Sequence, residues 1–114
     1  MIPKFRAWNS ETKEIEVFNT YEEISELFLA LSADDVFYSI MQSTGLFDKS
    51  GKEIFEGDIV RVLDSTYTVF YDNERGSYRL KPHDDRWNVD YMSNFSHGGN
   101  FEVVGNIYEN KEYL

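Results

Sequence analysis

The sequence predicts an α+β fold, mainly antiparallel β, in which an N-terminal hairpin and one amphipathic helix precede a small SH3-like or barrel-like β domain. Short segments rich in β-branched and aromatic residues recur between turn-forming residues along most of the chain. One segment has the apolar spacing of an amphipathic helix. No repeat or linker divides the 114 residues. We therefore expect a single domain, with the hairpin and helix in residues 1–35 and the mainly β part in residues 36–114.

Two alternating segments open the chain. Residues 4–8 and 14–18 alternate polar and apolar side chains, and the polar residues 9–13 between them are typical of a turn. This pattern predicts a β-hairpin. Its apolar residues Phe5, Ile15 and Val17 are expected to face inward.

A helix is predicted to begin at Tyr21. Thr20 and Glu23 have the spacing of a capping box, in which the hydroxyl and the carboxylate satisfy amides at the start of a helix. Apolar residues then recur at helical spacing, opposite a row of glutamates, at Ile24, Leu27, Phe28 and Leu31. We expect an amphipathic helix of about three turns that lies on a sheet and ends near residues 32–35.

The remaining strands are separated by tight turns. Strands are expected at residues 36–41, around Leu46, around Ile54, and at residues 59–63, 67–71, 77–80 and 101–108. Turns are expected at residues 48–51, 56–58 and 73–76, where glycine allows the backbone to reverse. Gly105 interrupts the last strand and predicts a bulge or a sharp bend.

Residues 81–100 break this pattern and contain both histidines. His83, Asp84, Asp85 and His97 are of the types that bind metal ions, but adjacent side chains of an extended segment point to opposite sides. Neither histidine is placed with a serine or cysteine in a pattern typical of nucleophilic catalysis. We therefore predict no metal site, no cofactor, no catalytic residue and no enzymatic activity.

Three aromatic residues in the same segment, Trp87, Tyr91 and Phe95, recur every four positions. This spacing would place the rings on one side of a short helix through residues 85–95. The alternative is a loop that covers the β domain. Because Trp and Tyr are enriched in binding hot spots, these three residues are the candidates for a partner-binding site.

Charge and composition argue against several classes of protein. The formal net charge is −10, and a negative field repels the phosphates of nucleic acids. Direct nucleic-acid binding would require the one basic stretch to converge on a single face; its residues are Arg75, Arg79, Lys81 and Arg86. The chain has no cysteine, no apolar N-terminal segment and no apolar run longer than residues 27–31. We therefore expect a cytoplasmic protein that does not enter a membrane.

Three segments together resemble the YopX family of small phage and prophage proteins. They are residues 4–8 (KFRAW), residues 42–60 with TGL followed by GKEIFEGDIV, and residues 104–110 (VGNIYEN). The residues that this chain shares with the family are mostly turn and bend formers: Arg6, Trp8, Gly45, Gly51, Gly57, Asp58, Gly105 and Asn106. Lys111 follows Asn110 where relatives often have proline, a departure that concerns only the tail.

The resemblance implies a mainly β fold with a barrel-like C-terminal part, a phage or prophage origin and a cytoplasmic location in a bacterial host. It implies no known biochemical activity. The surplus of rings, nine Phe, eight Tyr and two Trp, adds the expectation of a non-enzymatic module that binds a host or phage protein. The alternatives are an acidic nucleic-acid mimic or a regulator associated with nucleic acid. Self-association into a homo-oligomer is a separate expectation.

Overall fold

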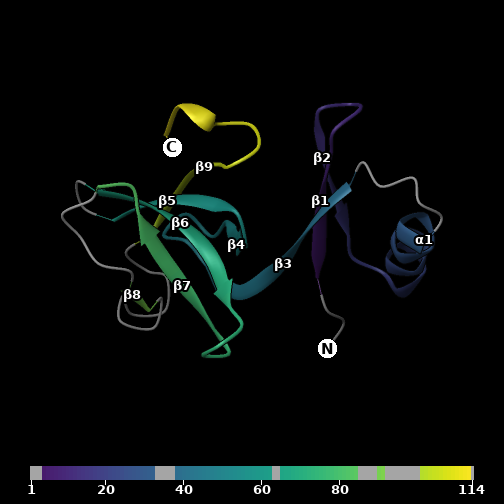
Figure 1. The fold of residues 1–114 in the computed structure, drawn as a ribbon, viewed down its shortest axis with the longest axis horizontal. Helices are drawn as coiled ribbons and strands as arrows, with labels where there is room; N and C mark the ends of the chain where they lie inside the picture. Colours follow the sequence, from purple (N-terminus) through teal and green to yellow (C-terminus); the bar gives the residue numbers. More distant parts are fainter. Residues whose placement is uncertain (1–3, 33–37, 63–64, 85–89, 92–100, 114) are drawn as a thin grey trace. The chain divides into compact units, whose positions relative to one another are not determined.

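The computed structural model describes residues 4–32, 38–62, 65–84, 90–91 and 101–113 (Figure 1). The strands among these residues form antiparallel ladders, which confirms the predicted fold class. In chain order, the elements are β1 (Phe5–Asn9), β2 (Glu14–Phe18), α1 (Tyr21–Ser32), β3 (Tyr38–Phe47), β4 (Glu53–Phe55), β5 (Asp58–Val62), β6 (Ser65–Asp72), β7 (Ser77–Pro82), β8 (Asp90–Tyr91), β9 (Glu102–Asn106) and the 3₁₀ turn η2 (Lys111–Tyr113).

The chain packs as two compact units, Met1–Ser43 and Thr44–Leu114. β3 begins in the first unit and ends in the second, within a sheet of strand order β2-β1-β3-β4. The other sheet has the order β8-β7-β6-β5-β9 and is curled like half of a barrel (Figure 1). The barrel-like part predicted from the sequence is therefore present in the second unit.

In the β2-β1-β3-β4 sheet the inner strand β1 is more buried than the outer strand β2. β1 pairs with β2 on one side and with β3 on the other, and Arg6 and Ala7 on β1 are buried. Val17 on β2 is 48% exposed, so the prediction that it faces inward is wrong. The reason is topological: β2 is the outer strand of the sheet, and an alternating pattern does not reveal which strand is covered on both sides.

The predicted helix start and its Thr20 N-cap are confirmed, whereas the Glu23 carboxylate binds the Thr20 hydroxyl instead of the Thr20 amide. The amide of Glu23 donates to the Thr20 hydroxyl at 3.1 Å, and that hydroxyl donates to the Glu23 carboxylate at 3.1 Å. The helix accordingly begins at Tyr21. Its covered side contains Leu27, which is 1% exposed. Within the part of the chain that the structure describes, no helix has the length and apolar character needed to cross a membrane.

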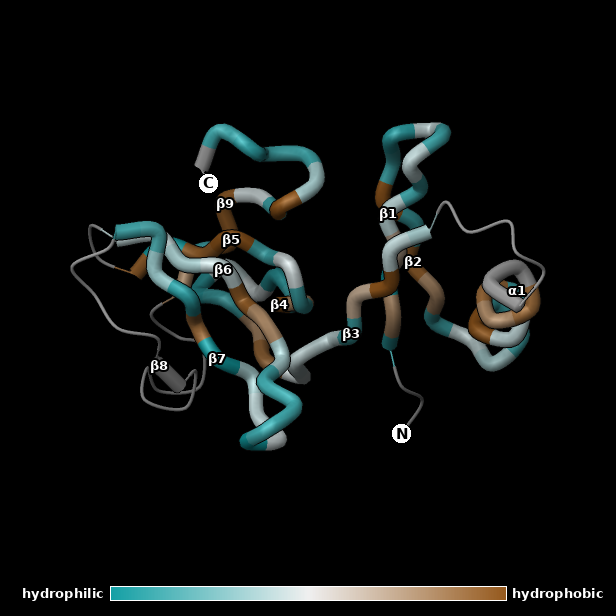
Figure 2. Tube along the Cα trace, viewed as in Figure 1, coloured by the Kyte–Doolittle hydropathy of each residue, from teal (hydrophilic) through white to brown (hydrophobic). Residues whose placement is uncertain are grey.

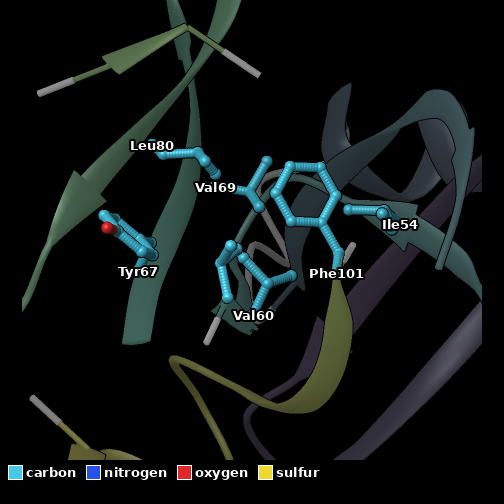
Figure 3. Packing of buried hydrophobic residues seen from close by; sticks show 7 residues of the cluster. Ile54, Val60, Tyr67, Val69, Leu80 and Phe101 are labelled. Atoms are coloured by element: carbon cyan, nitrogen blue, oxygen red, sulfur yellow. The ribbon is translucent and has the colours of Figure 1, made fainter. Parts of the chain in front are cut away.

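The core of the second unit is one cluster of alternating inward side chains (Figure 3). The strands β4 to β7 and the residue before β9 supply its members, which are Ile54, Val60, Val62, Tyr67, Val69, Leu80 and Phe101. Val60 lies opposite Tyr67 in the β5–β6 ladder, and Val69 lies opposite Leu80 in the β6–β7 ladder. The period of two along each strand therefore directs these residues to the same side of the curled sheet.

Glycines with left-handed backbone lie within β3 and in the two turns that flank β4. Gly45, Gly51 and Gly57 have φ angles of 79°, 84° and 82°, in the left-handed region that favours glycine. Gly57 also joins two other segments, because its amide donates to the carbonyl of Val69 at 2.8 Å and its carbonyl accepts from the amide of Ile107 at 2.9 Å. The turn before β5 is thus part of the sheet's hydrogen-bonding network.

The glycine in β9 has a different role. Ile59 pairs with Gly105 and Val60 pairs with Val103, so the register shifts by one residue and the predicted bulge is confirmed. A Cβ at position 105 would lie 2.5 Å from Cγ of Asn110. The space beside the bulge is therefore filled by Asn110, and only glycine fits there.

Candidate functional site

The three rings predicted to bind a partner fall largely outside the described residues. Trp87 and Phe95 lie outside them, and only the backbone of Tyr91 is described. That backbone belongs to β8, where Tyr91 pairs with Arg79 and Asp90 pairs with Leu80. A continuous helix through residues 85–95 is therefore wrong at its centre, because residues 90 and 91 form a strand ladder with β7.

The residues of metal-binding type at positions 83, 84, 85 and 97 are described only in part. His83 and Asp84 are described, whereas Asp85 and His97 lie outside the described residues. Among the residues that the structure describes, no group of three or more histidine, aspartate or glutamate side chains is arranged to hold a metal ion.

The buried carboxylate of Asp48 is engaged by the backbone. Its Oδ1 accepts from the amides of Ser50 at 2.9 Å and Lys52 at 2.8 Å, and its Oδ2 accepts from the amide of Val103 at 3.0 Å. Burial tends to raise the pKa of Asp48, but hydrogen bonds from the three amides and the charge of Lys52 hold that pKa below its usual value. Asp48 thus ties the turn after β3 to β9.

Two other buried polar side chains also bind backbone amides. Oδ2 of Asp58 accepts from the amide of Phe55 at 2.8 Å, within the turn between β4 and β5. Oδ1 of Asn106 accepts from the amides of Tyr108 at 3.0 Å and Glu109 at 2.9 Å, within the turn after β9. The shared family residues at positions 58 and 106 therefore have a structural explanation in this chain.

Two residues of the basic stretch converge on a single carboxylate. Nη1 of Arg75 and Nη1 of Arg79 lie 3.1 Å and 3.0 Å from Oδ2 of Asp72. Arg79, opposed by burial and assisted by Arg75, lowers the pKa of Asp72 below its usual value. Lys81 is exposed on the same strand, and Arg86 lies outside the described residues. Glu74 lies 3.9 Å from Arg75, so Asp72 and Glu74 together offset the positive charge of Arg75 and Arg79 locally.

The imidazole of His83 lies between two threonine hydroxyls of β6. Its Nδ1 is 2.9 Å from Oγ1 of Thr66, and its Nε2 is 2.7 Å from Oγ1 of Thr68. Burial, together with the positive charge of Lys81, lowers the pKa of His83 below 6.5. A neutral imidazole fits this geometry, because one ring nitrogen donates to a hydroxyl and the other accepts from one. His83 therefore fastens the end of β7 to β6.

The stability of the protein is expected to fall as the pH drops below 6.5, in part because of His83. The folded-state pKa of His83 is lower than the ordinary 6.5, so in this window the unfolded chain binds the proton first. Urea unfolding of wild type and His83→Gln, from about pH 8 to about pH 5, should show the larger loss in wild type. An imidazole that titrates above 6.5 in an NMR experiment would contradict this expectation.

Exposed hydrophobic side chains gather on α1. Among the described residues six large hydrophobic side chains are exposed, and three of them belong to α1: Tyr21 (64%), Phe28 (48%) and Leu29 (68%). At about 100° per residue, these three positions fall within about 100° of one another, with the exposed Ser25 between Tyr21 and Leu29, and the buried Leu27 lies opposite Leu29. Figure 2 shows hydrophobic residues on more than one side of α1. Tyr21, Phe28 and Leu29 are called the exposed α1 face below.

The exposed α1 face also has an internal support. The Phe28 ring packs edge-to-face on Phe5 of β1, with ring centroids 6.0 Å apart and an interplanar angle of 83°. One part of this side chain is therefore held against the sheet while the rest remains exposed. The Phe28 ring therefore contacts β1 and solvent at the same time.

Carboxylates border the exposed α1 face. Glu22 and Glu26 are exposed at the next positions around the helix, and α1 contains no basic residue. The first 43 residues carry eight acidic and three basic side chains, a formal net charge of −5. The exposed α1 face is therefore apolar at Tyr21, Phe28 and Leu29, is interrupted by the exposed Ser25, and is bordered by negative charge.

The sequence contained a signal for this surface that the helical pattern alone did not reveal. Phe28 was predicted to face inward, and Tyr21 and Leu29 were not identified as surface residues. Residues 27–31 are all apolar, and five consecutive helical positions extend around more than one full turn. Such a run cannot face a single sheet along its whole length, so it indicates a second contact surface.

Comparisons with known proteins connect the chain to a family. A family model described as YopX protein matches residues 4–114. The crystal structure of protein EF1440 from Enterococcus faecalis is similar at 26% sequence identity and a TM-score of 0.63, over 100% of this chain and 99% of that chain. No curated protein matches the chain. Neither description states a biochemical activity.

Proposed function

This chain belongs to the YopX protein family, and we propose that it acts as a non-enzymatic protein-interaction module that binds a partner through the exposed α1 face. The observation that carries this proposal is the grouping of Tyr21, Phe28 and Leu29 on one side of a short helix. Single exposed apolar residues are common on protein surfaces, whereas groups of them mark interaction sites. Tyrosine is also enriched in binding hot spots.

Four polar side chains of the second unit form hydrogen bonds within the fold. Asp48, Asp58 and Asn106 accept hydrogen bonds from backbone amides, and both ring nitrogens of His83 contact threonine hydroxyls. These groups explain the fold of the second unit without a substrate.

The family resemblance supports a phage or prophage origin for this module. In that setting the partner is a protein of the phage or of its bacterial host, and binding takes place in the bacterial cytoplasm. The partner is a protein rather than a nucleic acid in this proposal, because the net charge is −10 and Arg75 and Arg79 form ion pairs with Asp72 and Glu74.

The net charge favours a second candidate function, which is mimicry of nucleic acid. A surface with 21 acidic and 11 basic side chains could occupy the basic site of a nucleic-acid-binding protein. In that case the carboxylates would contribute the binding energy, and the apolar residues Tyr21 and Leu29 would not. The same experiment separates the two candidates.

The test is affinity capture from nuclease-treated bacterial lysate with the full-length protein and two variants. Alanine at Tyr21 and Leu29 removes two apolar side chains and keeps a high helix propensity. The matched control is Phe47→Ala, which removes a side chain that is 47% exposed on β3. We expect a protein that wild type and the control retain and that the double variant loses.

Circular dichroism should show the same helix content for all three proteins. If the double variant captures the same proteins as wild type, the exposed α1 face is not the binding surface. Capture that the double variant retains but added salt abolishes would favour mimicry instead.

A further inference from the structure

We infer that the partner of the exposed α1 face is a basic amphipathic helix. This inference rests on the proposed function and adds to it the chemistry of the partner. It combines two observations on α1: the apolar side chains Tyr21, Phe28 and Leu29, with the exposed Ser25 between Tyr21 and Leu29, and the carboxylates that border them on one side.

The exposed α1 face has the length of a helix-binding surface. From Tyr21 to Leu29 the helix rises by about 12 Å, which corresponds to eight residues. A partner helix presents apolar anchors at positions i, i+3 or i+4, and i+7, which span a similar length. Phe28 belongs to this face, and the contact of its ring with Phe5 would reduce the conformational entropy that binding costs.

The carboxylates define the charge of the partner. Glu22 and Glu26 are exposed one helical turn apart. Glu22 lies in the first turn, where a carboxylate also interacts favourably with the helix dipole. Glu26 lies in the second turn, where that explanation weakens. A partner helix with lysine or arginine beside its apolar stripe would pair with both carboxylates, and α1 has no basic residue that would oppose it.

The same charge argues against the other occupants of an apolar helix face. A second copy of this chain would bring its own carboxylates to the interface and add a charge of −10. An anionic lipid surface would be repelled by Glu22 and Glu26 for the same reason. Opposite charge thus selects a basic protein segment.

The probe for the test is a synthetic peptide of leucine and lysine, with leucine at positions a and d of the heptad. A peptide of the same composition in non-periodic order is its control. Binding to the full-length protein is measured by isothermal titration calorimetry, with the oligomeric state followed by sedimentation. Three double variants are compared with wild type: Tyr21→Ala with Leu29→Ala, Glu22→Gln with Glu26→Gln, and Glu74→Gln with Glu112→Gln. Glu74 and Glu112 are exposed in the second unit, so the last pair changes the net charge equally at another place.

The Tyr21→Ala, Leu29→Ala variant is expected to bind the periodic peptide about tenfold or more weakly than wild type. The Glu22 and Glu26 pair should weaken it by about threefold to tenfold in about 50 mM salt, and this difference should vanish in about 500 mM salt. The Glu74 and Glu112 pair should leave the affinity within about twofold of wild type. The non-periodic peptide should bind more weakly than the periodic one.

The remaining outcomes separate this inference from the proposed function. Suppose that the Tyr21→Ala, Leu29→Ala variant no longer captures the lysate protein, but the Glu22→Gln, Glu26→Gln variant binds the periodic peptide like wild type. The binding surface is then correct, and the inference of a basic partner is wrong. If both glutamate pairs weaken the peptide equally, only general charge attraction operates and the inference fails. A dimer that depends on Leu29 would replace it with self-association. If the Tyr21→Ala, Leu29→Ala variant captures the same lysate proteins as wild type, the proposed function itself is overturned.

Discussion

Replacement of Phe101 by alanine is expected to lower the free energy of unfolding by about 3–5 kcal/mol. The ring is 0% exposed and is the largest fully buried side chain among the described residues. It lies in the cluster with Ile54, Val60 and Val69 (Figure 3). The variant loses the transfer free energy of the ring and leaves a cavity that paired strands cannot readily fill. A domain of this size has about 5–15 kcal/mol in total, so little stability would remain.

Urea unfolding followed by far-ultraviolet circular dichroism measures this effect. The control is Phe47→Ala, which removes the same ring where it is 47% exposed and should cost less than about 1 kcal/mol. Equal losses for the two variants would show that Phe101 does not belong to the principal core of the second unit.

Replacement of Asp48 by asparagine is expected to lower the free energy of unfolding by about 2–4 kcal/mol at neutral pH. The carboxylate accepts from three amides with two oxygens, those of Ser50, Lys52 and Val103. Asparagine has one acceptor oxygen and would direct its own N–H group at an amide donor. At least one buried amide therefore loses its partner.

The pH dependence identifies the cause of this loss. Because the folded-state pKa of Asp48 is below the ordinary 3.8, its contribution is present above that value and disappears as the pH falls through the folded-state pKa. The stability difference between wild type and Asp48→Asn should therefore be large at about pH 7 and smaller at about pH 3. Glu74→Gln, at an exposed hairpin position, should show no comparable difference. A difference that stays constant from neutral to acidic pH would point to packing instead.

Features that depend on neighbouring residues could be predicted from the sequence. The N-cap needs only Thr20 and Glu23, three positions apart, and the structure contains the bond from the Glu23 amide to the Thr20 hydroxyl and a second bond between the two side chains. The bulge in β9 follows from a glycine within an apolar strand. Local geometry decides such features, so the sequence around them is sufficient.

Features that depend on distant residues could not be predicted in the same way. Asp48 was expected to form a turn, but its bond to Val103 joins residues 55 positions apart. Tyr91 has the spacing of a helix with its aromatic neighbours, yet its backbone pairs with Arg79 of β7. A ladder partner outweighs local periodicity, because pairing satisfies backbone groups that a short isolated helix would leave to water.

The sequence by itself determined the class of the fold, the start of α1, the tight turns and membership of the YopX family. The tertiary structure decided which apolar residues are covered. Val17 alternates like an inward residue but lies on an outer strand, and Leu29 continues an apolar run but faces solvent. A hydrophobic residue in the sequence indicates only that burial of its side chain is favourable. Whether each side chain is buried or left exposed depends on the elements that pack against it.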